Sequence, residues 1–192
     1  SKPDNTIYIQ NLIDTKGIAE LPEGVFYIKS TLKIPVDRKH GITGKGTGKT
    51  VIVGMTDDFP LISLLGGQDD NFVLAYLTLQ GGSTGIYASQ DFGTQHISYQ
   101  KLKFLVFRNQ KYGIHLKNMM GFDNQFINCD TSVSLVTTRA DNMNAWVDCK
   151  FDRGQTALSI GGQNGPIVAN CDFSNFNGKN VIIGNNINIH NT

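Results

Sequence analysis

The chain has 192 residues, and its 17 basic and 16 acidic side chains give a formal net charge of +1 at pH 7. This length suits one domain with a continuous core, and the 21 glycines favour short strands and turns over long helices. The sequence has neither the basic stripe of a nucleic-acid-binding protein nor an apolar run of about 18 residues that would mark a transmembrane helix. We therefore expect no nucleic-acid partner and no membrane partner.

The first predicted element is a short helix near the N-terminus. Asp4 or Asn5 can cap a helix that carries apolar residues such as Ile13. The first coil of a solenoid needs a cover with a polar outer face, and this helix can provide it. We predict a single domain in which residues 1–23 form the cap region and residues 24–192 form the coils.

The next feature is a glycine-rich segment, residues 44–50, with the sequence GKGTGKT. A phosphate-binding loop needs a glycine five residues before Gly48, where this chain has Thr43. It also needs a helix directly after the loop, but residues 51–53 are typical of a strand. We therefore reject nucleotide binding and expect a tight turn between coils.

Short apolar runs then recur along the chain at intervals of 20–27 residues. Their anchor residues are Leu77, Leu102, Cys129, Cys149 and Cys171. A second apolar run follows each anchor, and the intervals leave no room for a helical crossover, which takes about 10–12 residues. The pattern predicts an all-β, right-handed parallel β-helix: a solenoid with coils of unequal length and a short N-terminal capping helix.

The three cysteines, Cys129, Cys149 and Cys171, are predicted to stack inward as one ladder of core thiols. An odd number excludes complete pairing in disulfides. A ladder also does not converge on one point, as the four ligands of a zinc site must. We predict neither a metal nor a cofactor.

The end of the sequence still has the alternation of a strand over residues 187–192. A last coil with an open edge would promote association. We expect either that the chain is a fragment of a longer solenoid, with further coils beyond this edge, or that another chain covers it, as in a homo-oligomer such as a trimer.

Four segments of the first quarter together resemble the opening of pectate-lyase-superfamily β-helices. They are DNTIYIQNLID (residues 4–14), LPEGVFYI (residues 21–28), TLKIP (residues 31–35) and GITGKG with TVI (residues 41–46 and 50–52). This group includes polysaccharide lyases, glycoside hydrolases and phage tailspikes that cleave surface glycans. The resemblance implies an extracellular, cell-surface or virion protein that acts on a polysaccharide. It carries no catalytic residues over, because the polygalacturonase-like series Asn-Thr-Asp, Asp-Asp and Gly-His-Gly does not occur in order.

Strict alternation through the anchor strands sends Cys149 inward and Trp146 outward. In this register, one outer column contains Tyr99, Phe126 and Trp146. Contiguous exposed aromatic residues usually mark a contact surface, and their rings can stack on the C–H faces of sugars. A glycan-binding surface, a covering loop and a subunit interface would each explain the column.

Polar residues of the neighbouring columns complete the predicted substrate-binding surface. They are Lys101, Lys103, Asn128 and Lys150. Asp130 and Asp148 are predicted to lie one coil and two residues apart, about 8 Å between backbones. Because inverting glycosidases hold their two carboxyl groups about 6.5–9.5 Å apart, this pair is the candidate catalytic pair. The alternating charges would equally suit a surface salt ladder.

The sequence therefore leaves two functions open. The first is a glycan-binding or glycan-degrading β-helix, a lyase or a hydrolase if it is catalytic. A lyase would need a base and a cation, for which Lys101, Lys103, His115 and Arg139 are available. The second is a non-catalytic structural or adhesive module, such as a segment of a fibre or tailspike.

Overall fold

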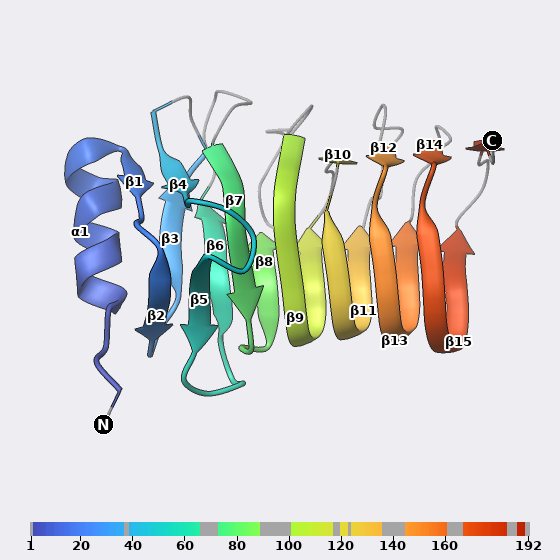
Figure 1. The fold of residues 1–192 in the computed structure, drawn as a ribbon, viewed down its shortest axis with the longest axis horizontal. Coiled ribbons are helices and arrows are strands. Elements are labelled where there is room, and N and C mark those ends of the chain that lie inside the picture. The colour runs from blue at the N-terminus through green and yellow to red at the C-terminus, as the bar shows by residue number, and fades with distance from the viewer. Residues whose placement is uncertain are drawn as a thin grey trace.

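The computed structural model describes residues 2–36, 39–65, 73–88, 101–116, 120–122, 124–135, 145–160, 167–183 and 188–190. These residues form one short helix and a series of strands that stack along one axis (Figure 1). All strand pairings between them are parallel. The predicted all-β parallel β-helix is confirmed, while its right-handed sense stays a prediction.

Equivalent strand segments of successive coils stack into three faces. The first face contains β1 (Ile18–Glu20), β4 (Gly41–Thr43), the start of β7 (Val73–Gln80), the start of β9 (Lys101–Leu116), β10 (Met120–Phe122), β12 (Ala145–Val147), β14 (Ile167–Ala169) and β16 (Asn188–His190). The second face adds β2 (Gly24–Ile28), β5 (Thr50–Gly54) and the starts of β11 (Gln125–Leu135), β13 (Lys150–Ile160) and β15 (Asp172–Ile183). The third face adds β3 (Leu32–Pro35), β6 (Pro60–Leu65) and β8 (Thr84–Ala88). Strand β9 runs through all three faces, which ties the coils into one body.

The N-terminal helix α1 (Thr6–Lys16) covers the first coil, as predicted (Figure 1). Asp4 rather than Asn5 provides the side-chain cap, because Asp4 Oδ1 accepts a hydrogen bond from the backbone N–H of Thr6 at 2.9 Å. Ile9 and Ile13 are fully buried on the side of α1 that contacts β1 and β3. The helix therefore closes the N-terminal end of the core.

Residues with left-handed backbone mark the bends between faces. The first corner, between the first and second faces, holds Tyr76, Phe104, Asp148 and Asn170, with φ from 51° to 60°. The second corner, between the second and third faces, holds Asn109, Asn128, Arg153 and Asn175, with φ from 53° to 57°. Each such residue takes up one position in the bend. Inward residues on the two sides of a corner are therefore three positions apart instead of two, as in Leu102, Leu105 and Phe107.

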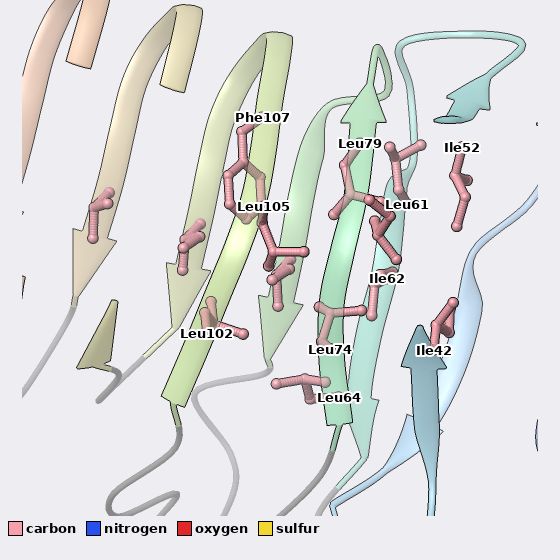
Figure 2. Packing of buried hydrophobic residues seen from close by; sticks show 14 of the residues in the cluster. Ile42, Ile52, Leu61, Ile62, Leu64, Leu74, Leu79, Leu102, Leu105 and Phe107 are labelled. Carbon is pink, nitrogen blue, oxygen red and sulfur yellow. The ribbon is translucent and has the colours of Figure 1, made fainter. Parts of the chain in front are cut away.

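The interior is built from columns of apolar side chains. Figure 2 shows Leu102, Leu105 and Phe107 of β9 in the same interior as Leu74 and Leu79 of β7. A second-face column of rings consists of Phe107, Phe126, Phe151 and Phe173, with centroids 4.7–5.0 Å apart and planes within 6°. Such stacking follows directly from the parallel register, which places equivalent residues of each coil above one another.

Glycines of the third face make room for the phenylalanine column. A Cβ added at Gly85 would lie 2.6 Å from Cδ1 of Phe107, and one added at Gly113 would lie 2.7 Å from Cδ1 of Phe126. Both distances are below 3.0 Å, a range in which Cβ contacts essentially never occur in real proteins. The aromatic column and the glycines opposite it are therefore complementary features of one core.

The predicted register was wrong for two aromatic residues. Trp146 is fully buried in the first face, where it pairs with Gly121 and Val168. Phe126 is fully buried in the phenylalanine column of the second face. Neither points outward, because a left-handed residue breaks the strict alternation on which the prediction relied: Asp148 between Trp146 and Cys149, and Asn128 between Phe126 and Cys129.

The predicted cysteine ladder is confirmed in part. Cys149 and Cys171 occupy one column, because Lys150 pairs with Asp172 one position further on. Cys129 is also buried, but it lies beyond the second corner and pairs with Gln110. The three thiols therefore do not form a single ladder.

Candidate functional site

A loop of residues 44–49 joins β4 to β5 and arches over β7 (Figure 1). Backbone N–H groups of this overhanging loop donate hydrogen bonds to the carbonyl oxygens of Ala75 (3.1 Å) and Tyr76 (2.9 Å) and to Oγ1 of Thr78 (3.0 Å). Strand β5 follows the loop directly, as predicted from residues 51–53. The glycine-rich segment therefore forms a cover on the second face.

The cover buries residues that face away from the core. Thr78 and Val106 are neighbours in an outward column of the second face, yet they are only 1% and 5% exposed. Gln125 and Lys150, the next residues of that column, are exposed. The cover therefore ends between Val106 and Gln125.

A groove of about 270 Å³ opens where the overhanging loop ends. Its lining residues are Thr47 of the loop, Phe104 and Leu105 of β9, Gln125 of β11, Asp148 of the first corner and Lys150 of β13. Leu105 is fully buried, whereas Gln125, Asp148 and Lys150 are exposed. The groove thus has an apolar part, formed by Phe104 and Leu105, and a polar wall.

Two exposed aromatic residues form a stack at the edge of this groove. The rings of Tyr76 and Phe104 have centroids 5.1 Å apart and lie within 11° of parallel. The two residues are 46% and 39% exposed. Tyr76 covers one side of the Phe104 ring, while Phe104 itself lines the groove.

The backbone of this aromatic pair is unusual. Tyr76 and Phe104 have φ values of 60° and 53°, a region that costs a bulky residue about 1–3 kcal/mol. The same corner carries Asp148 two coils beyond Phe104 and Asn170 three coils beyond it, and these residue types accept the left-handed region readily. The fold therefore does not require aromatic residues here, which makes the pair a candidate for a functional role.

Lys150, in the polar wall of the groove, makes only a weak ion pair. Lys150 Nζ lies 3.6 Å from a carboxylate oxygen of Asp172, and both side chains are largely exposed. This pair confirms one step of the predicted charge alternation. An exposed ion pair of this kind contributes little to stability, so a ligand can compete for Lys150 at low cost.

Of the predicted site residues, the structure brings Asp148 and Lys150 together in the groove. Lys103 is exposed in the first face, next to Phe104 but outside the groove lining. Asn128 lies at the second corner, where its Nδ2 donates a hydrogen bond to Oδ1 of Asn109 at 3.0 Å. Asn128 therefore belongs to a structural stack away from the groove.

Two further predicted residues cannot be placed in the site. Tyr99 lies outside the described residues. Lys101 is the first residue of β9, and its side chain lies outside the described part of the structure.

The structure does not bring Asp130 and Asp148 together. Gln125 pairs with Lys150, so the second-face segment of residues 125–128 separates the two carboxylates along the coil. Four strand residues alone span about 13 Å, which exceeds the separation of about 6.5–9.5 Å in inverting glycosidases. The predicted spacing of this candidate catalytic pair was therefore wrong.

The lyase candidates that the structure describes lie on different faces, and Lys101 and Lys103 are in the first face. His115 is on the third face, stacked on Tyr87 at 6.0 Å and tilted against Tyr112 at 5.0 Å. Burial lowers the pKa of His115. Arg139 lies outside the described residues.

Sequence reasoning missed four residues of the groove: Thr47, Phe104, Leu105 and Gln125. The sequence does contain a signal for this register. Inward apolar residues recur three positions apart across a corner and then two positions apart along the strand. Aligned on that spacing, Leu105 matches Leu77, and Phe104 then falls at the same corner position as Tyr76.

The described part of the chain contains no group of three or more His, Cys, Asp or Glu residues that could hold a metal ion. It also contains no helix that is long and apolar enough to cross a membrane. Comparison of the chain with family models, curated proteins and solved structures gives no match. The groove's own residues must therefore carry the functional argument.

Proposed function

We propose that this chain is a carbohydrate-binding β-helix whose ligand lies in the groove beside Phe104. The observation that carries the proposal is the exposed Tyr76–Phe104 stack, which has a costly backbone conformation at the edge of a polar groove. Strain that the fold does not require is typical of functional sites.

The groove offers two kinds of contact that suit a sugar. The ring of Phe104 provides a flat apolar surface for the C–H face of a pyranose. Thr47, Gln125 and Asp148 provide a hydroxyl, an amide and a carboxylate, which together can donate hydrogen bonds to sugar hydroxyls and accept them. Lys150 adds a cation that would also accommodate a sugar acid.

The proposal that the ligand is a polysaccharide rests on the resemblance of residues 4–52 to the pectate-lyase superfamily. The parallel β-helix itself supports this resemblance. On this proposal the protein acts on an extracellular polysaccharide, at a cell surface or on a virion. Binding is the part of the function that the groove supports. Cleavage by a lyase or hydrolase mechanism would need further catalytic groups beside Asp148. A non-catalytic adhesive module, such as a fibre or tailspike segment, is the alternative.

The test replaces Phe104 with asparagine, which fits the left-handed backbone but cannot stack on a sugar. We expect Phe104→Asn to weaken oligosaccharide binding about 5–150-fold, equivalent to about 1–3 kcal/mol, by analogy with stacking on other aromatic platforms. Isothermal titration calorimetry with neutral and acidic oligosaccharides measures this change. The control is Tyr8→Ala, which removes a 50% exposed ring from α1, and it should bind as the wild type does.

Wild-type binding that Phe104→Asn leaves intact would place the carbohydrate elsewhere. If no oligosaccharide of the panel binds, the carbohydrate proposal fails and the adhesive alternative gains support. Incubation with the bound polysaccharide then separates the activities. New ultraviolet-absorbing unsaturated ends identify a lyase, new reducing ends alone identify a hydrolase, and neither identifies a binding module.

A further inference from the structure

Two of the three cysteines lie directly above one another in adjacent coils. Lys150 pairs with Asp172, so the preceding residues, Cys149 and Cys171, are in register as well. Stacked strands lie about 4.8 Å apart, which is within the Cα separation of about 4.4–6.8 Å that a disulfide spans. The Cys171 thiol also reaches the coil of Cys149, because it donates a hydrogen bond to the carbonyl oxygen of Trp146 at 3.3 Å. A bond between them would therefore need little movement of the backbone.

The surroundings of Cys171 favour reaction. Its side chain is half-buried, whereas Cys149 is buried behind it. The hydrogen bond from the Cys149 thiol lowers the pKa of Cys171, although burial and the charge of Asp148 act in the opposite direction. Because the thiolate is the nucleophile, Cys171 is the better placed of the two to react first.

Cys129 provides an internal reference. It is fully buried, and burial raises the pKa of its thiol to about 12. Its partners in the adjacent coils are Gln110 and Gly154, so no cysteine stands in register with it. Any reaction that depends on stacked thiols should leave Cys129 unchanged.

We propose that Cys149 and Cys171 form a redox-active dithiol that closes to a disulfide between adjacent coils on reaction with a small disulfide such as oxidised glutathione. This inference is independent of the carbohydrate proposal. The Cys171 thiolate attacks one sulfur of oxidised glutathione, the glutathione S–S bond breaks, and one glutathione leaves as a thiolate. The Cys149 thiolate then attacks the Cys171 sulfur of the mixed disulfide and releases the second glutathione. Two protein thiols are oxidised, and one glutathione disulfide is reduced to two thiols that take up the two protons.

The disulfide would tie the coil that carries Asp148 and Lys150 of the groove to the coil that follows it. Cys149 lies between the groove residues Asp148 and Lys150. A bond that closes a loop of this length restricts the unfolded chain and should raise the melting temperature by about 5–10 °C. The proposed switch would thus stiffen the polar wall of the groove.

The test uses the full chain, incubated while folded with oxidised glutathione and then alkylated. We expect free thiols to fall from the three of the sequence to one, with a peptide that links Cys149 to Cys171 in mass spectrometry. Cys129→Ala should retain the disulfide and the rise in melting temperature. Cys149→Ser should lose both and should accumulate the mixed disulfide of Cys171 with glutathione.

Two results would overturn the proposal. The first is a folded protein whose cysteines all stay reduced in oxidised glutathione. The second is a disulfide that includes Cys129. Both are read from the wild-type chain, so the test does not depend on whether the variants fold.

Discussion

The two corners of the solenoid solve the same backbone problem with different residues. At the second corner the left-handed positions hold Asn109, Asn128, Arg153 and Asn175. Asparagine tolerates this conformation, and the side chains of Asn109 and Asn128 also hydrogen-bond across adjacent coils at 3.0 Å. At the first corner the equivalent positions begin with Tyr76 and Phe104. Architecture explains the asparagine residues of the second corner, but it does not explain the aromatic residues of the first.

This difference shows how a solenoid acquires a function without a change of fold. Corner residues project from the body and stack along its axis, so an exchange at one corner changes the surface while the core columns stay intact. The overhanging loop and the groove both lie at the first corner, next to the aromatic pair. The following changes test whether the two corners really divide structural and functional roles.

The largest expected effect concerns Asn124, which holds the first corner from inside. Its Oδ1 accepts a hydrogen bond from the N–H of Leu105 at 3.0 Å, and its Nδ2 donates one to the carbonyl oxygen of Leu102 at 2.9 Å. Asn124→Leu keeps the volume but leaves both buried backbone groups without these partners. We expect a loss of about 2–5 kcal/mol in the free energy of unfolding, measured by urea denaturation.

A matched control comes from the second corner. Asn109→Gly keeps the left-handed backbone and removes only an exposed hydrogen bond, so it should cost no more than about 1 kcal/mol. Equal stability of Asn124→Leu and the wild type would show that the first corner does not depend on this internal support.

An exchange of residues between the two corners should change the free energy of unfolding less than Asn124→Leu does. The change should have opposite signs at the two corners. Phe104→Asn relieves the backbone strain and should change the free energy of unfolding by between zero and about +1 kcal/mol. Asn109→Phe introduces that strain and removes the bond to Asn128, so it should cost about 1–3 kcal/mol. A large loss of stability in Phe104→Asn would instead give the Tyr76–Phe104 stack a structural role, and it would remove the main argument for the groove.

The fold could be predicted from the sequence because its signal is repeated. Apolar runs 20–27 residues apart, from Leu77 to Cys171, leave room for short strands and turns but not for helical crossovers. A local error in one run does not alter this conclusion. The helix at the N-terminus was equally accessible, since a capping residue precedes its apolar positions.

The site could not be predicted in the same way, because it depends on the register within each coil. Trp146, Cys149 and Phe151 all point inward, spaced three positions and then two, since Asp148 lies between them in the left-handed region. Strict alternation from Cys149 keeps Phe151 inside but turns Trp146 outward.

The cysteines show why local sequence could not reveal the corners. Asn128-Cys129 and Asp148-Cys149 look alike, and in both the residue before the cysteine is left-handed. The two pairs nevertheless lie at different corners. The prediction treated the two cysteines as equivalent positions of successive coils. It therefore assigned the residues around them to the wrong columns. Phe104 was missed because aromatic residues have no preference for the left-handed conformation.

The smallest expected effect is a pH dependence at the second corner. Asp152 accepts a hydrogen bond from the side chain of Asn175 at 2.9 Å and pairs with Arg153 at 3.1 Å. The Asn175 hydrogen bond, opposed by desolvation and assisted by Arg153, lowers the pKa of Asp152 below its ordinary value of 3.8. Asn175→Ala should therefore raise this pKa, which a carboxyl-carbon NMR titration measures directly.

The sign of the effect on stability follows from the direction of this shift. A carboxyl group whose pKa is lower in the folded state stabilises the fold fully above its unfolded pKa and loses that contribution as the pH falls through the folded value. The advantage of the wild type over Asp152→Asn in melting temperature should thus be constant above about pH 5 and shrink below about pH 4. A difference that stays unchanged down to about pH 2 would mean that the ionised form of Asp152 does not support the second corner. The asparagine residues would then hold this corner without help from the neighbouring charge.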